Sequence, residues 1–167
     1  MTKREAQTIL NKRKMYLHTP VGELELVADT NGLCRISFGK TAKASDICEE
    51  ETPVLRKAIE QLSEYFAGQR KVFELPLSLR GTDFQLRDWK ALLEIPYGET
   101  RSYKDIAEAV GCPRGFRAVG MANRRNPLPI VVPCHRVIGA DGSLTGYAGA
   151  NKALAIKEYL LKLEGAR

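Results

Sequence analysis

The chain has 167 residues, of which 44% are hydrophobic, and a formal net charge of +6. This length supports a buried core in one domain or two small ones. No apolar run approaches the ~20 residues needed to span a bilayer, and residues 1–14 lack the apolar core of a signal peptide. We therefore expect a cytoplasmic protein without a membrane partner.

A reducing compartment would keep cysteines as free thiols, and the chain has four: Cys34, Cys48, Cys112 and Cys134. They form no CxxC pair, and the sequence contains two histidines. A zinc site is therefore poorly supported. The remaining metal alternative would combine Cys34, Cys48 and His18.

The first half of the chain predicts a small sheet. Short β-like runs at 15–18, 24–28 and 33–38 are separated by the turn signals "TPVG" and "DTNG". The run "GELEL" alternates polar and apolar residues, as a half-buried strand does. Residues 1–13 are predicted to be a loose arm or a first helical turn, and residues 46–51 an acidic loop.

A helix is predicted after this loop. Thr52 is a good N-cap, Pro53 suits the first helical position, and apolar residues recur at helical spacing until Gly68. Residues 72–79 read as a further extended segment. Residues 1–80 are therefore expected to form an N-terminal α/β domain, a hairpin sheet plus a helix.

The second half, residues 81–167, predicts a mainly helical domain. The pair Thr82 and Gln85 has capping-box spacing and opens a helix through Leu93. Ser102 with Asp105, at the same spacing, begins a further helix from 103 to 110. Another helix is predicted from 115 to 124, and a last one is capped by Asn151. Residues 128–132, "LPIVV", read as a buried extended run. The expected fold class is thus α+β, with a small N-terminal α/β domain followed by a mainly helical C-terminal domain.

The helices at 103–110 and 115–124 have the spacing of a helix-turn-helix. Residues 101–136 carry seven basic and two acidic side chains, an excess that suits a polyanion. Arginines alternate with small residues here, which lets a backbone approach a nucleic-acid groove; the residues are Arg114, Gly115, Arg117, Ala118, Gly120, Ala122, Arg124 and Arg125. The alternative is an ordinary αα-hairpin with small residues at its packing interface.

The segment Pro133–Cys134–His135–Arg136 is a candidate nucleophile site. A cysteine nucleophile acts as the thiolate and needs a base or a positive environment, which His135 and Arg136 offer. Adjacent side chains seldom face each other, so we expect His135 to reach Cys134 through a water. Glu164, at the end of the last helix, is the candidate for orienting the imidazole. The alternative is a structural core cysteine.

The loop 139–149 contains four glycines and Tyr147. It lacks the lysine and hydroxyl residue of a phosphate-binding loop and the spaced glycines of a dinucleotide fingerprint. The functional interpretation is a pocket wall whose backbone amides contact a ligand. The alternative is a flexible surface loop.

Together these residues resemble the O6-alkylguanine-DNA alkyltransferase (methylated-DNA–protein-cysteine methyltransferase) family. The motifs "IPYGETRSY", "RAVG", "NP" and "PCHRVIG" occur in the family's order within residues 81–165. The resemblance implies a DNA repair protein that moves methyl or alkyl groups from O6-alkylguanine, and also O4-alkylthymine, in double-stranded DNA to its own cysteine. The reaction would follow flipping of the nucleotide and occur once, irreversibly, without cofactor or metal. The protein would be a monomer, with cooperative binding along DNA left open.

The resemblance also implies residue roles. Cys134 would be the alkyl acceptor, His135 its base, Glu164 the partner of His135, and Asn126 the residue that orders the cysteine segment. Tyr103 would donate a proton or hydrogen bond to guanine N3, and Arg117 would enter the duplex in place of the flipped base. The remaining substrate or DNA contacts would come from Tyr147, Ala148, Pro129, Val137, Lys157, Gly115, Phe116, Ala118, Gly120 and Arg124.

Two positions depart from the family's usual pattern. Ala148 stands where many members carry serine, so a hydroxyl near O6 is lost. Phe116 stands beside the arginine finger where a small residue is frequent. The alternatives to repair are a thiol hydrolase using Cys134 and His135, which leaves the helix-turn-helix unexplained, and a non-catalytic DNA-binding sensor, which would not need Cys134.

Overall fold

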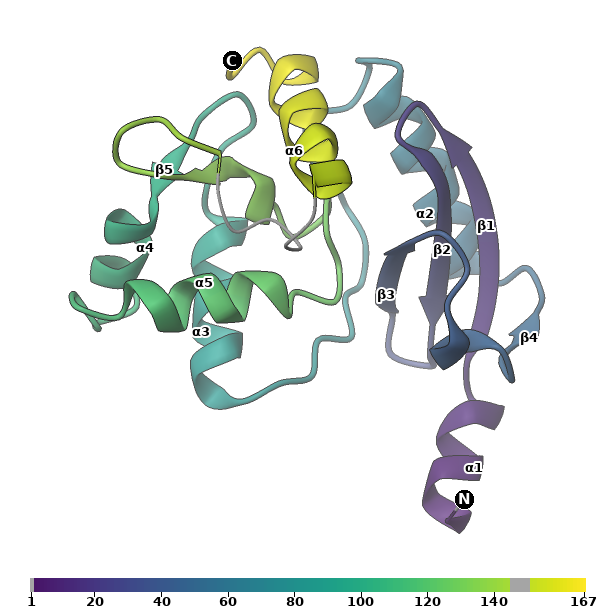
Figure 1. The fold of residues 1–167 in the computed structure, drawn as a ribbon. Helices are drawn as coiled ribbons and strands as arrows, with labels where there is room; N and C mark the ends of the chain where they lie inside the picture. Colours follow the sequence, from purple (N-terminus) through teal and green to yellow (C-terminus); the bar gives the residue numbers. More distant parts are fainter. Residues whose placement is uncertain (1, 145–150) are drawn as a thin grey trace. The chain divides into compact units, whose positions relative to one another are not determined.

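The computed structural model describes residues 2–144 and 151–167. The chain divides into two compact units, Met1–Leu79 and Arg80–Arg167 (Figure 1). Within the described ranges, no helix combines the length and apolar character needed to cross a membrane.

The N-terminal segment forms a short helix, α1 (Lys3–Leu10), where a loose arm or a single turn was predicted. Its start is a complete capping box, in which Thr2 accepts from the backbone of Glu5 and Glu5 accepts from the backbone of Thr2. Two of the four unpaired N–H groups at the helix start are satisfied in this way.

The first unit is built on a four-stranded sheet in the order β3-β2-β1-β4. The predicted strands are confirmed as β1 (Arg13–Thr19), β2 (Gly22–Ala28) and β3 (Leu33–Phe38), paired antiparallel. The expected acidic loop contains a fourth strand, β4 (Cys48–Glu49), which runs parallel to β1. A two-residue strand has no periodicity of its own, so the sequence pattern could not reveal it.

The prediction that β2 is half-buried is wrong, because Leu24 to Ala28 are all buried. The polar member of the alternation, Glu25, is completely covered and accepts from Thr41 Oγ1 (2.6 Å) and Tyr16 Oη (3.0 Å). A buried carboxylate is tolerated when such donors surround it. The chain after β3, which contains Thr41, therefore covers the face of β2 that carries Glu25. The alternating sequence pattern had predicted that this face is exposed to solvent.

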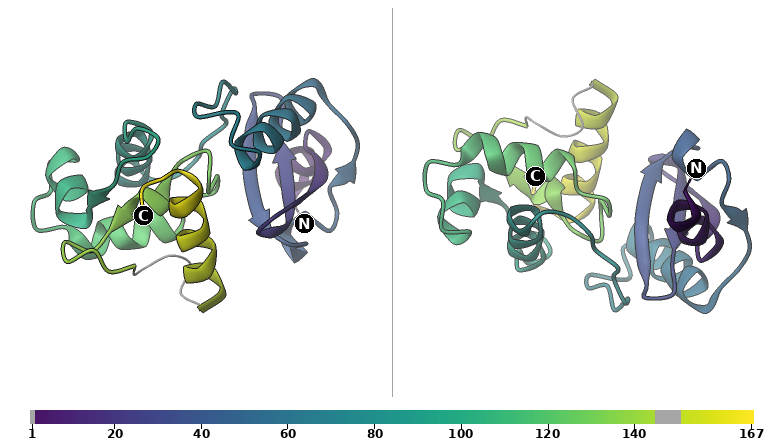
Figure 2. Two further views of the ribbon diagram at one scale, coloured as in Figure 1. Left: turned by 90° about the horizontal axis from the view of Figure 1, so that it is seen from above. Right: turned by 90° about the horizontal axis from the view of Figure 1, so that it is seen from below.

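The helix α2 (Pro53–Phe66) packs against β1, β2 and β3 and covers one face of the sheet (Figures 1 and 2). Thr52 caps it by accepting from Leu55 N, as predicted. Gly68 follows it with a φ of 75°, which suits glycine at a helix end. Residues 72–79 form no strand beyond one bridge between Leu77 and Leu33.

The second unit is mainly helical and contains α3 (Asp83–Leu93), α4 (Tyr103–Ala109), α5 (Phe116–Arg124) and α6 (Asn151–Leu163). Both predicted capping boxes are present, at the starts of α3 and α4. A short parallel pair, β5 (Arg101–Ser102) and β6 (Val137–Ile138), links the start of α4 to the segment after the candidate nucleophile. The predicted α+β class is confirmed.

The predicted extended run at 128–132 is wrong. These residues form turns, in which Val132 N donates to Leu128 O (2.8 Å). Ile130 has a φ of 78°, an uncommon conformation for a β-branched residue. The run is fully buried, and burial without periodicity does not distinguish a strand from a packed turn.

Candidate active site

Cys134 begins η2 (Cys134–Arg136), a 3₁₀ helix of one turn that connects the buried turns at 128–132 to β6. Its side chain is 4% exposed, and all residues from Leu128 to Val137 are buried. The cysteine is thus held in a rigid interior segment, where its thiol is shielded from bulk water.

Asn126 fixes the turns that lead to Cys134. Its Nδ2 donates to Val132 O (2.8 Å), and its Oδ1 accepts from Leu128 N (2.9 Å). The amide therefore bridges both ends of the segment that contains the strained Ile130. This geometry supports the ordering role expected of Asn126 and explains how a positive φ is maintained there.

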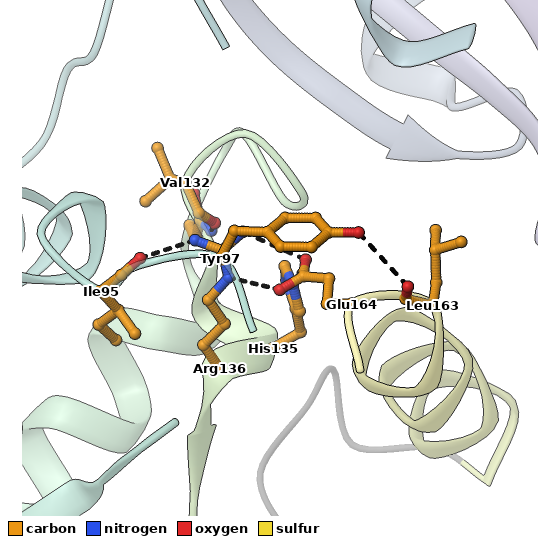
Figure 3. Close-up of polar contacts among 8 residues, drawn as sticks. Ile95, Tyr97, Val132, His135, Arg136, Leu163 and Glu164 are labelled. Carbon is orange, nitrogen blue, oxygen red and sulfur yellow. Dashed lines mark hydrogen bonds and ion pairs between the residues drawn. The ribbon is translucent and has the colours of Figure 1, made fainter. Parts of the chain in front are cut away.

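His135 and Arg136 both contact Glu164, as Figure 3 shows. Glu164 Oε2 lies 2.7 Å from His135 Nε2, and the carboxylate accepts from Arg136 Nε (2.7 Å) and Nη2 (3.2 Å). The Arg136 Nη1 donates to Ile95 O (2.7 Å). All three side chains are buried, so the carboxylate is paired by a two-pronged arginine contact in a region with little water.

The end of α6 places Glu164 in this cluster. Gly165 has a φ of 73°, and Ala166 N donates to Leu161 O (2.9 Å), which closes the helix just beyond Glu164. Tyr97 Oη donates to Leu163 O (3.3 Å) from the facing turn. Gly98 has a φ of 82°, and a Cβ there would lie 3.2 Å from Glu164 O, so glycine permits this close approach.

The contact with Glu164 defines the state of His135. A carboxylate accepts hydrogen bonds, so Nε2 carries the proton and Nδ1 keeps its lone pair. Burial lowers the pKa of His135, although Glu164 acts in the opposite direction. Nδ1 is buried and has no hydrogen-bond partner among the described residues. The ring is thus a neutral imidazole with one free acceptor nitrogen.

The thiol of Cys134 is protonated at rest. Burial raises its pKa to about 11, against the lowering effects of a hydrogen bond from Asn126 and of the nearby Lys157. Arg136, which the sequence suggested as a source of positive charge for the thiol, pairs with Glu164 instead. The cation that acts on Cys134 is Lys157.

Lys157 is itself buried and donates to Val137 O. Its Nζ lies 5.9 Å from the ring centroid of Tyr103, within the range of a cation–π contact. Burial lowers the pKa of Lys157 to about 8. Four predicted site residues, Cys134, Val137, Lys157 and Tyr103, are therefore brought together from different parts of the second unit.

The helices α4 and α5 pack against each other across the turn at 111–115. On α5, Val119, Ala122 and Asn123 face inward. Most predicted DNA contacts lie on this helix or next to it. Four of them are exposed to solvent: Phe116, Arg117, Ala118 and Arg124. The two glycines, Gly115 and Gly120, are half-buried. The face is basic and carries two large exposed apolar side chains, Phe116 and Met121.

Pro129 is buried in the turns that precede Cys134. Tyr147 and Ala148 lie outside the described residues.

The sequence prediction missed Arg136 as the partner of Glu164, and it missed Asp88, a completely buried carboxyl group on α3. Asp88 follows Arg87 in an ordinary amphipathic helix, so no local pattern marked it. Among the described residues, no group of three or more His, Cys, Asp and Glu side chains could hold a metal ion.

The geometry defines a class of protein: a two-unit α+β protein with a buried cysteine, a neutral imidazole fixed by a carboxylate, and an exposed basic helix, α5. Two family models match the chain, "6-O-methylguanine DNA methyltransferase, ribonuclease-like domain" over residues 12–79 and "6-O-methylguanine DNA methyltransferase, DNA binding domain" over residues 83–166. The chain belongs to the 6-O-methylguanine DNA methyltransferase family.

Relatives are similar over most of their length. The methylated-DNA–protein-cysteine methyltransferase of Methanosarcina barkeri is 51% identical over 151 residues, covering 89% of this chain and 94% of the relative. The constitutive enzyme of that name from Bacillus subtilis is 51% identical and covers 87% and 91%.

Solved structures agree with the fold. The Mycobacterium tuberculosis O6-methylguanine methyltransferase has a TM-score of 0.84 at 44% identity, covering 93% of this chain and 94% of that one. A structure of the M. tuberculosis protein in complex with DNA has a TM-score of 0.80 at 44% identity, with coverage of 93% and 92%.

Proposed function

We propose that this protein repairs alkylated double-stranded DNA by transferring the alkyl group of O6-alkylguanine to Cys134. The observation that carries the proposal is the buried His135–Glu164 pair beside the buried Cys134, within a family whose relatives are named as methylated-DNA–protein-cysteine methyltransferases. A thiolate is the nucleophile required for attack on an alkyl carbon.

The resting thiol must lose its proton before it attacks. His135 Nδ1 is the acceptor for that proton, through a water, because Nε2 is already bound to Glu164. Glu164 stabilises the imidazolium that forms, as the carboxylate of a catalytic triad does. Lys157 and Asn126 favour the thiolate.

The transfer balances without a cofactor. A bond forms between Cys134 Sγ and the alkyl carbon while the bond from that carbon to guanine O6 breaks. The electron pair remains on the guanine, which takes up a proton with Tyr103 as the donor at N3. The product is a thioether that no neighbouring group hydrolyses, so each molecule acts once.

Access to O6 requires the nucleotide to leave the base stack, which costs a few kcal/mol. The exposed α5 side chains offset this cost: Arg117 occupies the place of the departed base, and Arg124 contacts the backbone. The pocket would be completed by Pro129, Tyr147, Ala148 and the backbone of Val137, with Gly115, Phe116, Ala118 and Gly120 along the groove. O4-alkylthymine is a second substrate in this proposal.

A reactive free thiol and a DNA substrate both suit a reducing compartment, so the proposal places the protein in the cytoplasm. It acts there as a monomer, with its catalytic and DNA-binding groups in residues 81–167 and an α/β domain in residues 1–80.

Intact-protein mass spectrometry after incubation with an O6-methylguanine duplex tests the proposal. We expect a single, stoichiometric gain of one methylene mass that maps to Cys134 and is absent from Cys134→Ser. DNA binding without any mass gain would instead indicate a sensor. Repeated turnover of a thioester substrate without a stable adduct would indicate a hydrolase.

A further inference from the structure

Asp88 is a buried titratable group that the proposed reaction does not use. It lies on α3, and its side chain has no solvent exposure. The next residue, Trp89, donates its indole Nε1 to Ala122 O (2.9 Å) and fixes α3 against α5. Carboxyl groups are rarely buried without a cation, so the surroundings of Asp88 need an explanation.

Asp88 is contacted by one amide. Asn123 of α5, with its amide nitrogen toward α3, donates from Nδ2 to Asp88 Oδ2 (2.6 Å) and to Val119 O (3.3 Å). The other oxygen, Oδ1, is buried and accepts no hydrogen bond from the described residues. A single neutral donor does not offset the desolvation of a carboxylate.

Among the described residues, no cation on the elements packed against α3 compensates for this charge. The elements packed against α3 are α4, α5 and η2. On η2, His135 and Arg136 are bound to Glu164, and on α4 the phenol of Tyr103 is half-buried. The other charged side chains of these elements and of α3 are exposed to solvent: Asp83, Arg87, Lys90, Lys104, Asp105, Glu108, Arg117 and Arg124.

Burial raises the pKa of Asp88 to about 7. In its ionised form Asp88 raises the pKa of the Cys134 thiol. The two groups therefore oppose each other's ionisation. Below pH 7, Asp88 is largely an uncharged acid, and a thiolate can form at Cys134 without a second negative charge close by.

We propose that Asp88 is a positioning residue of the transfer reaction that works as a neutral carboxylic acid, holding Asn123 of α5 while leaving Cys134 free to ionise. This inference rests on the proposed function, in which Cys134 is the alkyl acceptor. Its consequence is a transfer rate that increases less steeply with pH once Asp88 ionises.

The test compares the wild type with Asp88→Asn, which keeps the shape and remains neutral at every pH. Single-turnover transfer from an O6-methylguanine duplex is followed between pH 6 and 9. We expect equal rates at pH 6 and a rate about threefold to tenfold higher for Asp88→Asn at pH 8.5, because the pKa of the Cys134 thiol is lower without the charge on Asp88. Asp83→Asn, at an exposed position of the same helix, should match the wild type. Parallel pH profiles, or a uniform loss of rate in Asp88→Asn, would overturn the inference.

A second measurement separates this inference from the proposed function. Alkylation of Cys134 by iodoacetamide, followed on its peptide without DNA, should show the same shift of the thiol pKa in Asp88→Asn. If the wild type accepts no methyl group, the proposed function fails, while the iodoacetamide comparison still decides the role of Asp88. Should the variant not fold, the ¹³C carboxyl shift of Asp88 in the wild type decides: a midpoint near 7 supports the inference, and one near 4 refutes it.

Discussion

The buried ion pair at Glu164 allows a prediction with a defined magnitude. Replacing Glu164 by Ala removes the two hydrogen bonds that Arg136 donates to the carboxylate. It also removes the acceptor for His135 Nε2. Arg136 is 6% exposed, and its guanidinium would retain one neutral acceptor, Ile95 O. A buried charge that loses its partner costs about 3–5 kcal/mol. Glu164→Gln keeps an acceptor of the same shape and should lose less, about 1.5–3 kcal/mol, the range for a hydrogen bond to a charged group.

The assay is reversible urea unfolding followed by circular dichroism, combined with the rate of methyl transfer. The control is Glu158→Ala on the same helix, whose ion pair with Lys162 spans 3.4 Å between side chains that are 45% and 62% exposed. Such a surface pair is worth at most about 0.5 kcal/mol. Both Glu164 variants should also transfer the alkyl group more slowly, because the imidazole loses the group that fixes its tautomer.

Two results would refute this reasoning. A Glu164→Ala protein within about 1 kcal/mol of the wild type would show that the cluster adds little to stability. An unchanged transfer rate in a folded Glu164→Gln protein would show that the imidazole does not need the carboxylate.

Three further predictions concern Asn126, Cys134 and Asp88. Asn126→Ala loses both hydrogen bonds that hold the turns at 128–132. We expect the free energy of unfolding in urea to fall by about 1–3 kcal/mol and methyl transfer to be slower. An unchanged transfer rate would exclude the ordering role of Asn126. The pKa of the Cys134 thiol near 11 predicts that iodoacetamide at pH 7 modifies exposed Cys112 first, and that the rate at Cys134 rises with pH up to about pH 10, less steeply where Asp88 ionises; equal rates at pH 7 in peptide mass spectrometry would contradict this. The pKa of Asp88 is raised on folding from 3.8 to about 7. The contribution of Asp88 to the free energy of unfolding is therefore fully present below its unfolded pKa of 3.8 and is lost as the pH rises through 7. Between pH 5 and 8.5 the wild type should lose about 2–3 kcal/mol relative to Asp88→Asn, and unfolding curves with the same pH dependence would refute the shift.

Local sequence determined where most elements begin and end. Thr52, Thr82 and Ser102 cap their helices as predicted, because a capping hydrogen bond spans three residues and needs no distant partner. The alternation and turn signals of residues 13–38 likewise predicted the three antiparallel strands. The motif at Cys134 and His135 identified the candidate nucleophile and base from adjacent residues.

Tertiary structure decided the features that depend on residues far apart in the chain. The burial of Glu25 depends on Thr41, and the turns at 128–132 depend on Asn126. Glu164 lies 28 residues from Arg136, and their pairing exists only because α6 ends against η2. The environment of Asp88 requires α3 and α5 to meet. Charge and pKa in an interior depend on which groups exclude water and which remain to pair, and that is a property of the packed protein rather than of any local pattern.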